Sequence, residues 1–178
     1  MKLVVNLLGA PGTGKSTTAA KLFAALKELN VNCELVTEYA KELVWHKRSE
    51  TMKDELYLFA KQNHRLCMLR DQVEIIVTDR PIILSSLYNQ MYGDQSEVFD
   101  NLVVHETNKY PNLNILLNRV KPYNPKGRVQ SEEESDNMKP LITKLLNSVG
   151  QEYTTLDADK DVVDKILILI EDRKGYDA

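Results

Sequence analysis

One stretch decides the fold of this chain: GAPGTGKST, residues 9–17. It matches the spacing G-x-x-x-x-G-K-[S/T] at every fixed position. Its members are Gly9, Ala10, Pro11, Gly12, Thr13, Gly14, Lys15, Ser16 and Thr17. The glycines allow backbone angles and close approaches that a Cβ atom would block. The amide groups of the loop can therefore point inward and form a nest that binds anions.

The sequence on both sides of this loop supports the same interpretation. Residues 3–8 form an apolar run interrupted only by Asn6, which is typical of a strand buried on both faces. An amphipathic helical pattern follows the loop, and the helix that begins near Lys15 adds the positive end of its dipole. We therefore expect a P-loop in which Lys15 reaches the β- and γ-phosphates of ATP and Ser16 ligates Mg²⁺.

The rest of the chain alternates between short apolar runs and helical patterns. We expect further strands at 33–37, 74–78, 113–118 and 153–156. We expect helices at 51–72, 82–92 and 95–109. A further helix should follow a capping box that begins at Ser131, and a last one should lie near the C-terminus. This alternation predicts an α/β fold with a parallel sheet and helices on both faces. With 178 residues, we expect a single domain over 1–178.

Two acidic residues stand where predicted strands end. Asp79 closes the run IIVTD, and Glu38 follows the second strand in the same manner. Ligands of open α/β sheets bind at this carboxyl edge, so Asp79 is a candidate for holding Mg²⁺ and Glu38 for accepting a proton from an attacking hydroxyl. The alternatives are structural: Asp79 as the N-cap of the next helix, and Glu38 as a first-turn glutamate favoured by the helix dipole.

The loop at about 119–131 is rich in basic residues. It follows the fourth strand and carries Arg119, Lys121, Lys126 and Arg128, together with two prolines and one glycine. Phosphoryl transfer needs cations around its developing negative charge, and arginine can hold two phosphate oxygens at once. We expect a lid in which Arg119 and Arg128 act on the transferring group. The alternative is an ordinary solvated loop.

Composition narrows the class of protein further. A net charge of −3 argues against a protein that coats nucleic acid, and two isolated cysteines fit a reducing compartment. We find neither a signal peptide nor a membrane-length apolar run, so we expect a cytoplasmic protein, as a monomer or homodimer. The three histidines lack metal-ligand spacing, whereas Gln62 and Arg65 are weaker candidates for facing a substrate.

Four segments together resemble small P-loop nucleoside and nucleotide kinases, especially the ribosylnicotinamide-kinase-like ATPase domain and its bacteriophage versions. These segments are GAPGTGKST at 9–17, TEYAKE at 37–42, VTDRPI at 77–82 and RVKPYNPKGRVQSEEES at 119–135. The resemblance implies a P-loop NTPase fold with five parallel strands in the order 2-3-1-4-5. It also implies that residues 155–159, including Asp157 and Ala158, lie against adenine.

The same resemblance implies roles for single residues. It assigns phosphate and Mg²⁺ binding to Lys15 and Ser16, matches Asp79 and Glu38 to the family's acidic residues, and matches Arg119 and Arg128 to its lid arginines. The pair Asp79-Arg80 is similar to deoxynucleoside and thymidylate kinases instead. We expect ATP- and Mg²⁺-dependent phosphoryl transfer to a nucleoside-like or nucleotide molecule. A modified base or hydroxyl in DNA as acceptor, and an ATP-hydrolysing switch or binding module, are the alternatives.

Overall fold

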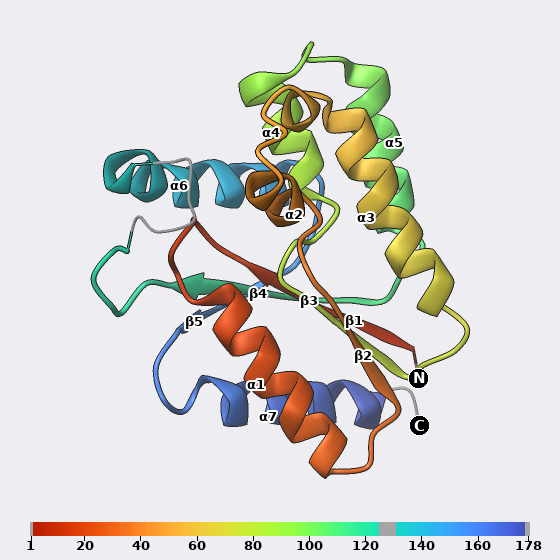
Figure 1. Cartoon of the computed structure of the whole chain (residues 1–178). Coiled ribbons are helices and arrows are strands. Elements are labelled where there is room, and N and C mark those ends of the chain that lie inside the picture. Colours follow the sequence, from red (N-terminus) through yellow and green to blue (C-terminus); the bar gives the residue numbers. More distant parts are fainter. Residues whose placement is uncertain (1, 125–130, 177–178) are drawn as a thin grey trace.

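A five-stranded parallel sheet forms the centre of the molecule (Figure 1). The computed structural model describes residues 2–124 and 131–176. Its strands are β1 (Leu3–Leu8), β2 (Cys33–Val36), β3 (Ile75–Thr78), β4 (Asn112–Asn118) and β5 (Thr154–Asp157). Their order is β2-β3-β1-β4-β5. The expected α/β class and strand order 2-3-1-4-5 are confirmed, and this is the fold of a P-loop NTPase.

Strand β1 lies in the middle of the sheet because its sequence is apolar on both faces. All six of its residues are buried, and Val5 pairs with Val77 of β3 on one side and with Leu113 of β4 on the other. A strand with neighbours on both edges and helices on both faces has no contact with water. The loop at residues 9–14 therefore leaves the sheet from its central, fully buried strand.

Helices cover both faces of the sheet (Figure 1). They are α1 (Lys15–Glu28), α2 (Ala40–Trp45), α3 (Glu55–Leu69), α4 (Leu84–Tyr92), α5 (Glu97–Thr107), α6 (Glu132–Ser148) and α7 (Val162–Tyr176). Helices α1 and α7 pack on one face through Leu22 and Ile166. Helices α3 to α6 pack on the other face, where Phe59 and Ile142 belong to a second apolar cluster.

The expectation of one helix over 51–72 is wrong in its extent. A 3₁₀ turn, Thr51–Lys53, is separated from α3 by Asp54, whose side chain accepts a hydrogen bond from the amide of Tyr57 at 2.9 Å. An N-cap of this kind starts a new helix, because it satisfies an amide that has no carbonyl partner. The break places Glu55 at the first turn of α3.

Other boundaries differ from the expected ones by one or two residues, and one element was not anticipated. The short helix α2 has no clear sequence signal, and only Leu43 of its residues is buried. The capping box of α6 is confirmed, since Ser131 and Glu134 exchange both side-chain-to-backbone hydrogen bonds. No helix within the described part of the chain is both long enough and apolar enough to span a membrane.

Candidate functional site

The loop between β1 and α1 has the backbone geometry that its glycines permit. Gly9, Gly12 and Gly14 have φ angles of 145°, 85° and 100°, a region that residues with a side chain rarely adopt. A Cβ atom on Gly9 would lie 2.8 Å from Thr13 Oγ1 and 3.0 Å from the carbonyl oxygen of Leu117. The loop therefore turns tightly over the end of the sheet, and Gly14 leads directly into α1.

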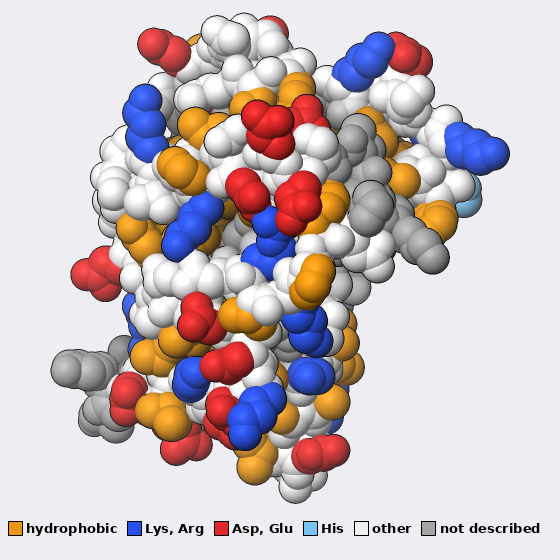
Figure 2. Space-filling view, turned by 90° about the vertical axis from the view of Figure 1, so that its left-hand side faces the viewer, with side chains coloured by type: hydrophobic (Ala, Val, Ile, Leu, Met, Phe, Trp, Pro, Cys, Tyr) orange, Lys and Arg blue, Asp and Glu red, His pale blue; other side chains and the backbone are white. Residues whose placement is uncertain are grey.

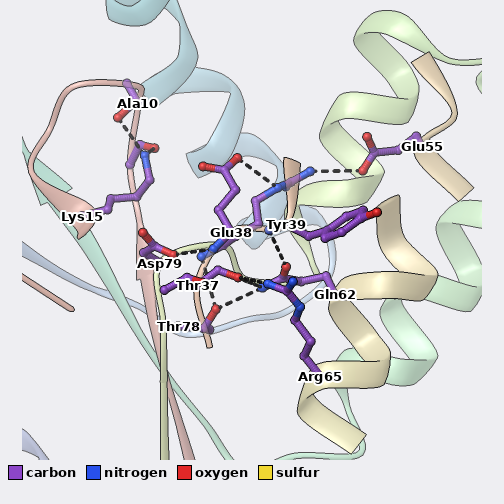
Figure 3. A network of polar contacts seen from close by, with 12 residues as sticks. Ala10, Lys15, Thr37, Glu38, Tyr39, Glu55, Gln62, Arg65, Thr78 and Asp79 are labelled. Atoms are coloured by element: carbon purple, nitrogen blue, oxygen red, sulfur yellow. Dashed lines mark hydrogen bonds and ion pairs between the residues drawn. The ribbon is translucent and has the colours of Figure 1, made fainter. Parts of the chain in front are cut away.

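Lys15 folds back over this loop. Its Nζ donates to the carbonyl oxygens of Gly9 at 2.7 Å and Ala10 at 2.9 Å (Figure 3). Thr13 Oγ1 also donates to the carbonyl of Ala10, at 2.9 Å. From outside the loop, Ser135 Oγ donates to the carbonyl of Pro11 at 2.7 Å, which ties the first turn of α6 to the loop. The ammonium group is thus held at the loop by hydrogen bonds.

A cavity of about 620 Å³ extends from this loop along the carboxyl edge of the sheet. Pro11, Gly12 and the start of α1 form one end, and side chains from α2, α3 and α4 form the other. The other residues that line the cavity are Glu38, Ala40, Lys41, Val44, Trp45, Met52, Lys53, Glu55, Leu58, Asp79, Arg80, Leu84, Tyr88, Tyr92, Gly93 and Glu134. One cavity thus joins an anion-binding loop to a mixed polar and aromatic surface.

The two acidic residues expected at strand ends both line this cavity. Asp79 is buried, and its Oδ1 accepts a hydrogen bond from the backbone amide of Glu38 at 2.9 Å (Figure 3). Asp79 does not cap α4, which begins five residues later and has Ile83 at its N-cap position. Asp79 therefore ties the ends of β2 and β3 together at the site.

The oxygen donors at the loop fit Mg²⁺. Ser16, in the first turn of α1, and Asp79 line the same cavity. Mg²⁺ usually takes one or two protein oxygens and completes its shell with water and substrate phosphates. Among residues 2–124 and 131–176, no group of three or more His, Cys, Asp or Glu side chains forms a metal site. A shared site with a nucleotide is the arrangement this donor set suits.

Arg80 has a central position in the site that its sequence context alone did not indicate. Its Nη2 donates to Glu55 Oε1 at 3.1 Å, its Nε lies 3.7 Å from Glu38 Oε1, and its Cζ lies 4.3 Å from the ring centroid of Tyr88. Nη1 is buried and has no hydrogen-bond partner among the described residues. The dipeptide Asp79-Arg80 was the available signal, whereas nothing local marks Glu55 or Tyr88.

Burial shifts the pKa values around this guanidinium group. Burial raises the pKa of the Glu55 carboxyl above its ordinary value, and the positive charge of Arg80 offsets part of that rise. Burial likewise raises the pKa of Tyr88 to about 12. Burial is the largest influence on Arg80 and lowers its pKa, but the charges of Glu55, Tyr88 and Glu38 and the hydrogen bond to Glu55 together outweigh it, so the net shift of the pKa is upward. The structure therefore holds a charged arginine in a largely dry environment.

Gln62 and Arg65 lie on α3 but support the backbone. Gln62 is buried; its Oε1 accepts from the amide of Tyr39 at 3.1 Å, and its Nε2 donates to the carbonyl of Thr37 at 3.4 Å. Arg65 donates to the same carbonyl of Thr37 (Figure 3). It also pairs with Glu42 at 2.6 Å. Neither residue lines the cavity as the described residues form it.

Of the two expected lid arginines, the structure describes one. Arg119 follows β4, and its Nη2 contacts Asp136 and also lies 3.3 Å from Glu132 Oε1, both on α6. Its guanidinium carbon lies 5.3 Å from the ring centroid of Tyr123. Arg119 is not among the described residues that line the cavity. Arg128 lies outside the described residues, as do all of residues 125–130 of the expected lid.

The residues expected near adenine lie beside the loop. Asp157 ends β5 and accepts a hydrogen bond from Asn118 Nδ2 at 2.8 Å, and the amide of Ala158 donates to the carbonyl of Asn118 at 3.1 Å. A Cβ atom built on Gly14 would lie 3.4 Å from the Cβ of Ala158. The end of β5 and the start of α1 are therefore packed together.

The glycine-rich loop, the order of the strands and the cavity beside them together define a P-loop NTPase. Its architecture is that of small nucleotide and nucleoside kinases. A family model described as an AAA domain matches residues 4–164, and the chain belongs to this family. A search of curated proteins found no match.

Solved structures with the same fold include two kinase-related proteins. Thymidylate kinase from Ehrlichia chaffeensis has a TM-score of 0.62 and 15% identity, over 96% of this chain and 98% of that one. The NadR protein in complex with NR also has a TM-score of 0.62, with 19% identity over 90% of this chain. The match spans 45% of the NadR chain. At these identities the likeness shows the fold alone.

Proposed function

We propose that this protein transfers the γ-phosphoryl group of ATP to a nucleoside-like or nucleotide small molecule in a Mg²⁺-dependent reaction. The observation that carries the proposal is the single cavity of about 620 Å³ that contains both the phosphate loop and the Glu38–Asp79–Arg80 group. Kinases need two substrates side by side with water excluded between them. A protein that hydrolyses ATP only as a switch needs the part of the cavity that holds the nucleotide, but no second site for an acceptor.

In this proposal the loop holds the triphosphate. Lys15 leaves the carbonyls of Gly9 and Ala10 and neutralises charge on the β- and γ-phosphates. Ser16 and Asp79 would hold Mg²⁺, which supplies further positive charge at those oxygens. The amides of residues 9–17 complete the cradle. Asp157 and Ala158, beside Gly14, are proposed to border the adenine.

The part of the cavity lined by Glu38, Glu55, Arg80 and Tyr88, which we call the acceptor end, provides a base. Glu38 is proposed to accept the proton of the attacking hydroxyl, while the acceptor oxygen bonds to the γ-phosphorus and the bond from that phosphorus to the bridging oxygen of ADP breaks. The cations Lys41, Lys53 and Arg80 line the cavity together with the carboxylates of Glu38, Glu55 and Asp79. This end of the cavity therefore offers both hydrogen-bond acceptors for a hydroxyl and positive charge for a phosphate.

The lid remains part of the proposal. We expect Arg119, and Arg128 with it, to reach the transferring group when ATP is bound, because arginine stabilises the charge spread over the phosphoryl oxygens. For Arg119 this means leaving Asp136 and Glu132. Protection of this loop from protease by a non-hydrolysable ATP analogue would support that movement, and equal cleavage with and without the analogue would contradict it.

The deciding experiment follows the label of γ-labelled ATP. The protein is incubated with Mg²⁺ and with nucleosides, nucleoside monophosphates or DNA that contains a modified base. Label on a small molecule, whether a nucleoside or a monophosphate, supports the proposal. Release of inorganic phosphate alone would indicate the switch. Lys15→Ala protein, prepared identically, controls for contaminating kinases, and excess chelator should abolish labelling.

Label on DNA would favour the other kinase hypothesis. Figure 2 shows acidic and basic side chains intermingled over one face of the molecule. Affinity for a DNA backbone comes from phosphate neutralisation by clustered lysine and arginine residues. On this face the described lysine and arginine side chains are interspersed with acidic ones. The net charge of −3 also weighs against binding to a DNA backbone, and a small molecule is the acceptor that we propose.

A further inference from the structure

Arg80 is shared unequally between two carboxylates. It donates to Glu55 Oε1 at 3.1 Å, and both side chains are at most 9% exposed. Its Nε lies 3.7 Å from Glu38 Oε1, and the Glu38 side chain is 33% exposed. The first contact is a hydrogen bond in a dry environment, whereas the second is a longer ion pair beside the cavity. Arg80 is thus held mainly by Glu55.

The position of Glu55 calls for an explanation. A glutamate in the first turn of a helix is favoured by the dipole even when water surrounds it. Glu55 is instead buried, and a buried ion pair often adds no net stability over apolar groups of similar size. Its partner retains one unpaired buried nitrogen, Nη1, within the described part of the chain. The network is therefore not arranged for maximum stability.

We propose that Glu55 is a positioning residue that keeps Glu38 available to the acceptor. A carboxylate oxygen engaged by a guanidinium group cannot freely accept the hydrogen of a substrate hydroxyl. By holding Arg80 against Tyr88, Glu55 keeps the guanidinium at 3.7 Å from Glu38 and prevents a closer pair. This inference rests on the proposed function, because it assigns Glu38 to the acceptor hydroxyl.

The first variant is Glu55→Gln, which keeps the size and one acceptor oxygen but removes the charge. Arg80 should then pair with Glu38 alone. We expect kcat to fall about tenfold or more, as part of what a general base contributes, while KM for ATP stays within about twofold. Glu42→Gln is the matched control, since Glu42 pairs with Arg65 at 2.6 Å between α2 and α3 but does not line the described cavity. It should keep normal kcat.

A double-mutant cycle separates positioning from a purely structural role. If Glu55 acts through Glu38, then Glu55→Gln should have little further effect on kcat in a Glu38→Gln background. If Glu55 only supports the fold, its effect should appear in full in both backgrounds. Full additivity, or normal kcat in Glu55→Gln, would overturn the proposal. If Glu55→Gln fails to fold, Glu55→Asp replaces it, because aspartate retains the charge. We then expect a smaller loss of kcat, and the same double-mutant cycle is measured with this variant.

A crystal structure of Glu55→Gln tests the geometry without any turnover. We expect Arg80 to approach Glu38 to hydrogen-bond distance, about 2.7–2.9 Å. An unchanged separation of the two groups would refute the inference, whatever the kinetics. If no acceptor is ever labelled by wild-type protein, the proposed kinase activity fails, whereas this structural readout still judges the role of Glu55.

Discussion

The two ends of the cavity are built in different ways. The phosphate end consists of the backbone groups of consecutive residues 9–17. The positive φ angles of its glycines and the hydrogen bonds of Lys15 set its shape. The acceptor end consists of the side chains of Glu38, Glu55, Arg80 and Tyr88, which come from four separate segments. Local sequence therefore determines the first end, whereas the second depends on how α2, α3 and α4 pack. The first end should tolerate distant changes, and the second should not.

The largest effect is expected from Lys15→Ala. Its Nζ donates to the carbonyls of Gly9 and Ala10 in the same loop, and we expect the fold to remain intact. Turnover should fall below roughly a tenth of the wild-type rate, because groups that stabilise developing charge contribute several kcal/mol. Labelled-phosphate kinetics with circular dichroism will test this. A variant that keeps more activity would show that the loop amides alone bind the phosphates.

Asp79→Asn is expected to have the next largest effect. Asparagine can still accept the amide hydrogen of Glu38 through its side-chain oxygen, so the loss of the charge is the main change. We expect kcat to fall far more than affinity for ATP, as measured by turnover and by calorimetric titration. Equal losses in both would mean that Asp79 contributes to ground-state binding.

Gly14→Ala tests the backbone geometry of the phosphate end. The φ angle of 100° is strained for alanine, and the new methyl group would meet Ala158 at 3.4 Å. We expect a loss of unfolding free energy of roughly 1–3 kcal/mol, together with weaker ATP binding. Gly150→Ala is a useful comparison, because its φ of 67° is also positive but nothing lies within 4 Å of the added atom. It should lose stability without losing affinity.

Ser135→Ala should have the smallest effect. It tests most directly whether the phosphate end of the cavity is independent of distant packing. Its hydroxyl donates to the carbonyl of Pro11, the contact described here between the loop and α6. Removal should lower the unfolding free energy by about 1 kcal/mol and leave kcat nearly unchanged. Thermal unfolding beside turnover measurements will separate the two. A large loss of kcat would show that the phosphate end also depends on distant packing.

The fold could be predicted from the sequence because its signals are local. The loop motif, the strand before it, which is apolar except for Asn6, and the strand-ending Asp79 each depend on neighbouring residues only. The capping box at Ser131 is likewise contained in four positions. By contrast, the break at Asp54 was missed because apolar periodicity continues across it. A single side-chain cap outweighed that pattern.

The acceptor end was only partly predictable for a physical reason. Glu38 and Asp79 were found because carboxyl ends of parallel strands share one edge. Glu55 looks like an ordinary first-turn glutamate, and its burial follows from the packing of α3 against the start of α4. Gln62 looked like a substrate contact but satisfies buried backbone groups instead. Side-chain chemistry alone does not reveal which direction a helical residue faces.

A ligand that binds to Lys15 must first displace the hydrogen bonds that its ammonium group makes within the loop. Each bond from the ammonium group to Gly9 or Ala10 contributes on the order of 1.5–3 kcal/mol when made to a charged donor. An anion must offer more than these two bonds to draw the side chain away. A single weakly charged anion competes poorly with them, whereas a polyphosphate presents several oxygens and charges at once. We therefore expect the loop to bind polyphosphates in preference to singly charged anions.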